Sequence, residues 1–262
     1  QEARRQRQMC IRDSIYKVDH KIADKLEEFS KLLFKGTLRH SYPHSWRSKA
    51  PLIYRNTPQW FISMEKNNLR DIALKSIDET IFYPPQGQTR LRSMIETRPD
   101  WCVSRQRVWG VPLPLFVSKK TGQPLRDENI INRIADIYEK EGSNTWFTED
   151  PQRFLGDEYS LEDYEQVKDV VEVWFDSGST HAFCLEQRED LKWPASMYLE
   201  GSDQHRGWFH SSLLESSGTR GKAPYESVLT HGFVVDGRGR KMSKSLGNVI
   251  SPNDILKKYG VD

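Results

Sequence analysis

Apolar residues recur at spacings of three and four over residues 19–34, with charged residues between them. This is the period of an α-helix that has one apolar face. Shorter patterns of the same kind predict helices over residues 68–76 and 128–141. The apolar face of the first helix is formed by Ile22, Leu26, Phe29 and Leu33.

Other segments are rich in β-branched and aromatic residues and predict strands instead. Between the last two of these strands, residues 205–217 predict a helix, and a closing helix begins at Pro252 after Ser251. A strand, a helix and a further strand describe a parallel α/β unit, in which ligands bind outside the carboxyl ends of the strands. The predicted strands cover residues 58–64, 170–175, 195–201 and 227–235.

Composition is that of an ordinary soluble protein, with 29% charged and 36% hydrophobic residues in a chain of 262. No apolar run approaches the roughly 20 residues that a membrane helix needs. The net charge is only +2, so the chain is not a polycation, but basic residues cluster at 4–7, 105–107 and 238–244. Such clusters can meet phosphates without a high overall charge, although a solvated face is the better interpretation of the first. The cysteines, Cys10, Cys102 and Cys184, are odd in number and far apart, which favours a reducing, cytosolic setting.

The segment Lys241-Met-Ser243-Lys244-Ser245 follows a glycine-rich stretch that begins at Gly237, after a predicted strand. Glycines let the backbone approach phosphate closely, and lysines supply point charges for a polyphosphate. The alternative is a Lys/Ser surface loop. The position between a strand and a helix favours the phosphate site.

A second group of polar residues lies where the strand over 195–201 runs into the next helix. Carboxylates at Glu200 and Asp203 can accept hydrogen bonds from ribose hydroxyls or an ammonium group. The alternative is that Asp203 only caps its own helix.

Further residues are open to two interpretations each. Trp174 stands at the end of a predicted buried strand, where tryptophan is usually part of the core. His231 can likewise be a satisfied core histidine. Arg105 and Arg107 can contact RNA or pair with acidic residues.

Together these motifs resemble the class I aminoacyl-tRNA synthetases, and the stretch over 198–209 is similar to the isoleucyl branch nearly letter for letter. The resemblance covers about residues 19–262 and implies an α/β fold with a Rossmann-like parallel sheet, the second half of a class I catalytic domain. It also implies an irregular α+β insertion and the tail of an editing domain. The expected division is 1–39 as a disordered start and the exit of the editing domain, 40–100 as a return connection and 101–262 as the catalytic half.

The resemblance also implies roles for individual residues. Lys241, Ser243 and Lys244 correspond to the KMSKS loop that stabilises charge on the ATP phosphates. Trp174 and Trp208 correspond to the walls of the amino-acid pocket. The residues that correspond to the ATP and adenylate site are Glu200, Gly201, Asp203, Gln204, His231, Gly232 and Lys244.

The implied activity is that of an isoleucine–tRNA ligase, with isoleucine, ATP with Mg²⁺, and tRNA(Ile) as its partners. A cytoplasmic location and a monomeric full-length enzyme are expected. The His-Ile-Gly-His signature and most of the editing pocket are expected upstream, so these residues alone are expected to be inactive. Zinc is not expected, because Ser45 and Ser48 stand where some relatives carry cysteine ligands.

Three alternatives to this activity remain open at the level of sequence. A valyl- or leucyl-tRNA synthetase is favoured by a pocket that lacks the tryptophan pair. A non-catalytic, RNA-binding relative is favoured by a degraded lysine loop, and this loop is intact. A nucleotidyltransferase on a related fold needs no pocket lined by tryptophan.

Overall fold

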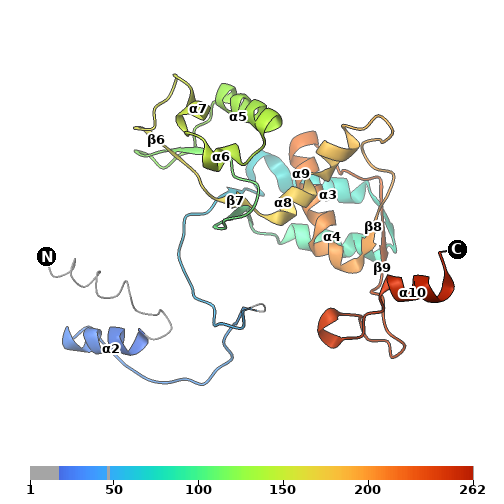
Figure 1. Cartoon of the computed structure of the whole chain (residues 1–262), viewed down its shortest axis with the longest axis horizontal. Coiled ribbons are helices and arrows are strands. Elements are labelled where there is room, and N and C mark those ends of the chain that lie inside the picture. The colour runs from blue at the N-terminus through green and yellow to red at the C-terminus, as the bar shows by residue number, and fades with distance from the viewer. Residues whose placement is uncertain (1–17, 46–47, 262) are drawn as a thin grey trace. The chain divides into compact units, whose positions relative to one another are not determined.

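The computed structural model describes residues 18–45 and 48–261 of the chain (Figure 1). The basic cluster at 4–7 and Cys10 lie outside these described residues. The chain divides into two compact units between Thr57 and Pro58. The first unit contains helix α2 (Asp19–Glu28) and a short bridge between His44 and Pro51.

Helix α2 is shorter than the predicted helix over 19–34, since it ends at Glu28. Ser30 has a left-handed backbone with a φ of 52°, which ends the helix. None of the residues of α2 is buried, and Leu33, beyond the end of the helix, is fully exposed. Helical stability in proteins comes mainly from packing of the apolar face, and among the described residues this face has no packing that would support another turn.

The centre of the second unit is a three-stranded parallel sheet in the order β2-β9-β8. Its strands are β2 (Ile81–Tyr83), β9 (Ser227–His231) and β8 (Tyr198–Gly201). This confirms the predicted parallel sheet.

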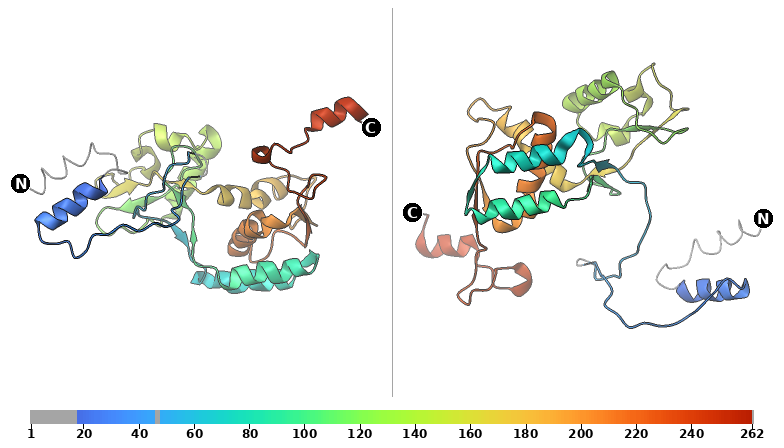
Figure 2. Two further views of the ribbon diagram at one scale, coloured as in Figure 1. Left: turned by 90° about the horizontal axis from the view of Figure 1, so that it is seen from below. Right: turned by 180° about the vertical axis from the view of Figure 1, so that it is seen from behind.

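One face of this sheet is covered by helices α3 (Leu69–Asp78), α4 (Gln86–Glu96) and α9 (Trp208–Arg220). Figure 2 shows α3 and α4 lying side by side. The predicted helix over 68–76 is confirmed as α3. The buried row of the sheet, which packs with these helices, is Phe82, Val228 and Tyr198.

The next row of the same strands points to the opposite face of the sheet, because side chains alternate along a strand. Tyr83 and Leu199 pair with Leu229 in this row and are 50% and 54% exposed. A parallel sheet is normally covered on both faces. This sheet is therefore covered on one face by helices of the chain and carries large apolar side chains in the open on the other.

A smaller second core is built from residues 116–166 and matches the predicted irregular α+β insertion. Trp146 is fully buried at its centre, packs edge-on against Phe116 and Phe154, and donates from Nε1 to the carbonyl of Val167 at 2.8 Å. The predicted helix over 128–141 is confirmed. The elements of this core are β5 (Phe116–Ser118), β6 (Tyr164–Gln166), α5 (Glu128–Glu141), α6 (Thr145–Thr148) and α7 (Gln152–Leu155).

The second unit also contains two short antiparallel pairs of strands: β1 (Phe61–Ile62) with β3 (Trp101–Cys102), and β4 (Ser104–Arg105) with β7 (Val170–Val171). The strand predicted over 58–64 is therefore reduced to two paired residues. The remaining described elements are the short helices η2 (Lys66–Asn68), α8 (Val173–Gly178), η3 (His181–Leu185), η4 (Ser202–Arg206) and η5 (Lys244–Leu246), and the closing helix α10 (Pro252–Tyr259).

The strand predicted over 170–175 is wrong beyond Val171, because α8 begins at Val173. Its partner β4 is only two residues long, so the ladder ends there. The buried carboxylate of Glu172 then accepts from Trp101 Nε1 at 2.8 Å and pairs with Arg105. These contacts hold the chain where it turns from strand into helix, and Trp174 is consequently on a helix.

The boundaries around β8 and β9 also differ from the prediction. Gly207, with φ −134° and ψ −117°, separates η4 from α9, so the long helix begins at Trp208. Strand β9 ends at His231 rather than residue 235 because its neighbour β8 ends opposite it, at Gly201.

Candidate functional site

The carboxyl ends of β8 and β9 bring together several of the predicted adenylate-binding residues. Glu200 pairs with Thr230, and Gly201 with His231. A side chain at Gly201 would lie 2.6 Å from Asp203 Oδ1 and 3.8 Å from His231 Cε1, so these groups converge on the one position that has no side chain. His231 is exposed, which excludes a core histidine, and its Nδ1 lies 2.7 Å from the carbonyl oxygen of Gly232.

Gln204 connects this strand end to the start of α9. Its Oε1 accepts from the backbone N–H of Trp208 at 3.0 Å, and its Nε2 donates to Asp203 Oδ2 at 3.3 Å. Gln204, rather than Asp203, therefore satisfies an N–H at the start of the helix. The carboxylate of Asp203 stays exposed at the site.

The two tryptophans flank the same junction. Trp208 stacks on the buried ring of Tyr198, with 4.0 Å between ring centroids and 4° between planes, and donates from Nε1 to the carbonyl of Ser177 at 3.0 Å. Trp174 lies against Gly207, where an added side chain would come within 2.8 Å of its ring. Trp174 is 41% exposed, so the interpretation as a core tryptophan does not hold. One anchored indole and one open indole thus stand beside the ends of β8 and β9.

A buried acid lies beneath the helix that carries Trp174. Glu215 of α9 is 8% exposed and contacts Gly178, the last residue of α8. Its Oε1 has no hydrogen-bond partner among the described residues. Burial, with a smaller contribution from Asp176, raises the pKa of the Glu215 carboxyl to about 9. The carboxyl is therefore protonated near neutral pH, which lets α8 and α9 pack closely without a buried charge.

Replacement of Glu215 by glutamine should make stability less dependent on pH. The folded pKa of about 9 is above the ordinary value of 4.5, so the folded state holds the proton more tightly. The carboxyl's favourable contribution is complete below pH 4.5 and is lost as pH rises towards 9, by up to about 1.4 kcal/mol per pH unit. The melting temperature of Glu215→Gln minus that of the parent should therefore increase when both are measured at pH 8 instead of pH 5. The exposed Glu139→Gln is the control, and an equal slope in both variants would contradict the assignment.

The lysine loop begins after β9 and is folded back on itself, with Val235 bridged to Lys241. Lys241 Nζ lies 3.5 Å from the centre of the Phe233 ring, a cation–π contact. Lys244 is exposed and forms no ion pair with any residue that the structure describes, so it is not paired with Glu200 or Asp203. Ser243 Oγ accepts from the N–H of Leu246 at 3.3 Å and starts the short helix η5. The structure thus brings the strand-end residues together, while the lysines belong to a separate loop.

Some residues of the site have no signal in the sequence motifs. Ser177 supplies the carbonyl that orients Trp208, and Tyr198 supplies the ring on which it stacks. Tyr198 is the first residue of the motif stretch over 198–209, so the sequence could have indicated its role. Ser177, in contrast, acts only through its backbone carbonyl. Such a role leaves no trace in residue type.

Arg105 and Arg107 could contact RNA or pair with acidic residues, and the structure decides between these alternatives for Arg105. Arg105 pairs with the buried carboxylate of Glu172 and donates to the carbonyl of Cys102 at 3.0 Å. It therefore holds the turn into α8. Arg107 is exposed.

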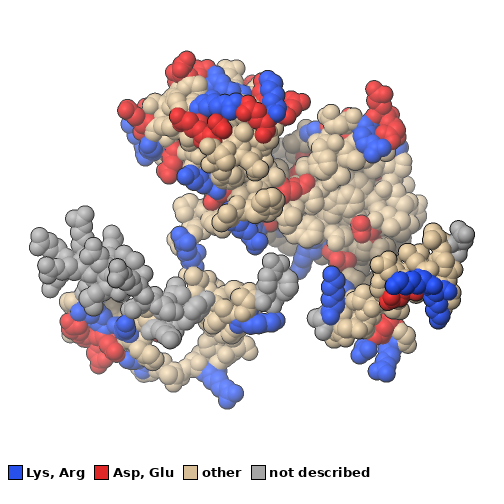
Figure 3. Space-filling model, viewed as in Figure 1, with Lys and Arg blue, Asp and Glu red and all other residues tan. Residues whose placement is uncertain are grey.

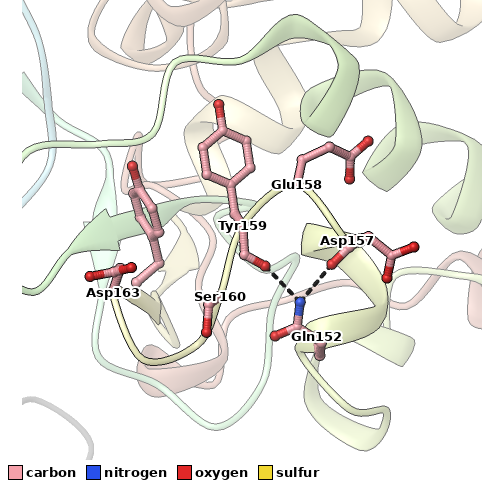
Figure 4. A pocket seen from close by; sticks show the side chains of 8 residues that line it. Gln152, Asp157, Glu158, Tyr159, Ser160 and Asp163 are labelled. Carbon is pink, nitrogen blue, oxygen red and sulfur yellow. Dashed lines mark hydrogen bonds between the residues drawn. The ribbon is translucent and has the colours of Figure 1, made fainter.

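A pocket elsewhere in the chain lies in the insertion, between α7 and β6 (Figure 4). Gln152 spans its floor, donating from Nε2 to the carbonyls of Gly156 and Tyr159 at 2.6 and 2.7 Å. Two of its carboxylates form ion pairs with residues outside the lining, Glu158 with Arg133 and Asp163 with Lys120. None of the predicted site residues lines this pocket, and it adds nothing to the strand-end site.

Charge is distributed unevenly over the second unit (Figure 3). The insertion is densely covered with both signs, and several of its residues form ion pairs with one another. The visible face of the part that contains the sheet is mostly uncharged. Among residues 18–45 and 48–261, no group of three or more His, Cys, Asp or Glu side chains is arranged to hold a metal ion. Within the same part of the chain, no helix is both long and apolar enough to cross a bilayer.

Curated relatives of the chain share a name. It is 71% identical to an isoleucine–tRNA ligase of Pelagibacter ubique over 95% of its own length and 27% of that protein. It is 60% identical to the isoleucine–tRNA ligase of Brucella abortus over 92% of its length and 25% of that protein. The chain therefore spans about a quarter of the length of these relatives. The predicted resemblance to the isoleucyl branch is confirmed.

Solved structures show a weaker likeness. A leucyl-tRNA synthetase complex of Agrobacterium radiobacter K84 matches with a TM-score of 0.42 and 25% identity, over 62% of this chain and 23% of that one. A methionyl-tRNA synthetase of Mycobacterium tuberculosis with methionyl-adenylate matches with a TM-score of 0.49 and 19% identity, over 86% and 36%. The profile of the class I tRNA synthetases (I, L, M and V) matches residues 6–262. The chain belongs to the class I tRNA synthetase family.

Proposed function

We propose that these residues form part of an isoleucine–tRNA ligase, which activates isoleucine with ATP and transfers it to tRNA(Ile). The observation that carries this proposal is that Gln204 links Asp203, just after the carboxyl end of β8, to the start of α9 at Trp208, while Trp174 lies against the intervening Gly207. Trp174 and Trp208 offer apolar walls, while Glu200 and Asp203 offer acceptors for an ammonium group or ribose hydroxyls. The names of the relatives support isoleucine over valine or leucine as the substrate.

The chemistry assigned to the site is positioning and charge stabilisation. The isoleucine carboxylate attacks the α-phosphate of ATP, which forms isoleucyl-adenylate and releases pyrophosphate. A terminal ribose hydroxyl of the tRNA then takes the acyl group, and AMP leaves. Mg²⁺ bound with ATP supplies further positive charge at the phosphates.

Each group of residues has a part in this scheme. Lys241, Ser243 and Lys244 contact the phosphates on which charge develops. His231 and Gly232, at the end of β9, lie next to Gly201 and serve the adenosine side. Gln204 fixes the start of α9 and with it the indole of Trp208.

The open face of the sheet supports a role within a larger catalytic domain. Tyr83 and Leu199 expose apolar surface that a further layer would bury. We propose that residues 101–262 are one half of such a domain, with 40–100 as a return connection that adds β2 to its sheet and 1–39 as the exit of an editing domain. We propose that the complete enzyme acts in the cytoplasm, where translation takes place. We also propose that it is a monomer.

An exchange assay tests the proposal. A complete ligase that carries these 262 residues, called the complete ligase below, should catalyse isoleucine-dependent ATP–pyrophosphate exchange and charge tRNA(Ile). The 262 residues alone should show no exchange, since they contain no His-Ile-Gly-His signature to complete the phosphate site. Exchange that depends on valine or leucine, but not on isoleucine, would overturn the substrate. Robust exchange by the 262 residues alone would show that the phosphate site lies wholly within them.

A further inference from the structure

The carboxylate of Asp236 lies at the start of the lysine loop and gathers four hydrogen bonds. Its Oδ1 accepts from the backbone N–H groups of Arg238 at 2.9 Å and Arg240 at 3.0 Å. Its Oδ2 accepts from Arg240 Nε and from Asn248 Nδ2, both at 3.0 Å. These bonds, led by that from Asn248, lower the pKa of the Asp236 carboxyl to about 2. The acceptor is therefore a charged carboxylate throughout the neutral range.

Asn248 lies at the other end of the loop and uses both ends of its amide. Its Nδ2 donates to Asp236 and also to the carbonyl of Lys241 at 3.3 Å. Its Oδ1 accepts from the backbone N–H of Ser243 at 2.9 Å. Gly247, with a φ of 65°, makes the left-handed turn that brings Asn248 back to these partners. One side chain thus joins the first residue of the loop to the backbone of the lysine motif itself.

We propose that Asp236 and Asn248 form a clasp that positions the lysine motif for the ATP phosphates. This inference rests on the proposed function. The clasp consists of these two side chains and holds residues 237–247 in one shape from both ends. Neither residue contacts the phosphates. Each acts through the backbone of Lys241 and Ser243 and so through the direction in which Lys244 is presented.

The physical reason is preorganisation. An unclasped loop would lose backbone freedom each time ATP binds, and that loss of entropy opposes the ordering of the loop on the phosphates. A loop held beforehand has already lost that freedom, and its charges need no rearrangement as the transition state forms. The clasp is expected to act on the rate of activation and on ATP, and not on isoleucine.

A reciprocal exchange of the two residues tests the clasp. Asn248→Asp places a second carboxylate within about 3 Å of the Asp236 carboxylate. In the complete ligase, kcat of ATP–pyrophosphate exchange should fall by about 10²-fold, as expected for misplaced catalytic charge, while KM for isoleucine stays unchanged. Adding Asp236→Asn removes the like-charge pair and restores one hydrogen bond between an amide and a carboxylate, and should recover at least about tenfold of the rate. Asn132→Asp, which adds the same charge at an exposed position of α5, is the matched control and should leave the rate unchanged.

A second measurement reports on the clasp without using catalysis. Trypsin cleaves after Arg238, Arg240, Lys241 and Lys244, all of which lie inside the clasped loop. Cleavage there should be faster in Asn248→Asp than in the parent and should slow again in the double variant. Thermal melting of each variant shows whether it is folded. If Asn248→Asp is not folded, Asn248→Ser is used in its place.

The outcomes separate the clasp from the function on which it rests. A parent enzyme without isoleucine-dependent exchange overturns the proposed function, and the cleavage rates then still test the clasp. Equal exchange and equal cleavage in the parent and Asn248→Asp overturn the clasp. So does a double variant that recovers neither quantity, because the two side chains then act independently.

Discussion

Replacement of Lys244 by alanine in the complete ligase lowers the rate of isoleucine-dependent ATP–pyrophosphate exchange by on the order of 10²-fold or more. Lys244 is exposed at the start of η5 and pairs with no acid among the described residues, so its charge is available to a polyphosphate. A preorganised charge of this kind acts where charge develops in the transition state. KM for isoleucine should change little. The measurement is kcat and KM for both substrates in the exchange assay.

Two other lysines serve as comparisons for this variant. Lys257→Ala removes one positive charge from the exposed surface of α10 and should leave exchange unaltered. Lys241→Ala should have a smaller effect than Lys244→Ala, because the Lys241 ammonium lies over the Phe233 ring and must give up that contact to reach the phosphates. Unchanged exchange in Lys244→Ala would remove Lys244 from the catalytic assignment.

Replacement of Trp174 or Trp208 by alanine reduces the preference for isoleucine over valine in the activation step. The two amino acids differ by one methylene, worth about 1–3 kcal/mol in a hydrophobic pocket, a general range for which isoleucyl-tRNA synthetases are themselves a reference case. Loss of either wall should therefore lower kcat/KM for isoleucine by about 10-fold or more and lower the isoleucine-to-valine ratio. Because such walls cannot by themselves exclude valine, the complete ligase should also need an editing step that removes misactivated valine.

The structure distinguishes the two tryptophans. Trp208 stacks on Tyr198 and donates to Ser177, so Trp208→Ala should also lower the melting temperature. Trp174 is 41% exposed, and Trp174→Ala should change selectivity with little loss of stability. Trp208→Phe keeps a stacking ring and controls for packing. If both alanine variants keep the parental ratio of kcat/KM values, the pocket is built from other residues.

The motifs that identify the chain consist of residues close together in the sequence, so they can be recognised without a structure. The Lys241–Ser245 segment, the stretch from Tyr198 to Phe209 and the strand-helix-strand pattern predicted the family and the parallel sheet, and both are confirmed. The helix α5 was also predicted at its observed ends, because its period is a property of consecutive residues.

Tertiary contacts decided the rest. The valines at 170–173 are typical of a strand, yet only two of them find a partner, and an ion pair between Arg105 and the buried Glu172 holds the turn into α8. The indole of Trp174 therefore stands on a helix and in the open. Strand β9 stops where β8 stops, which places His231 at the sheet end.

The sequence by itself determined the family, the parallel sheet and the residue types of the candidate site, because these depend on local spacing and chemistry. Only the tertiary structure decided that Gln204 rather than Asp203 serves α9, that Glu215 lies buried against Gly178, and that Asp236 meets Asn248. Each of these depends on where a side chain finds a partner. Gly178 and Glu215, like Asp236 and Asn248, are distant in sequence and become neighbours only once strands, helices and loops have closed on one another.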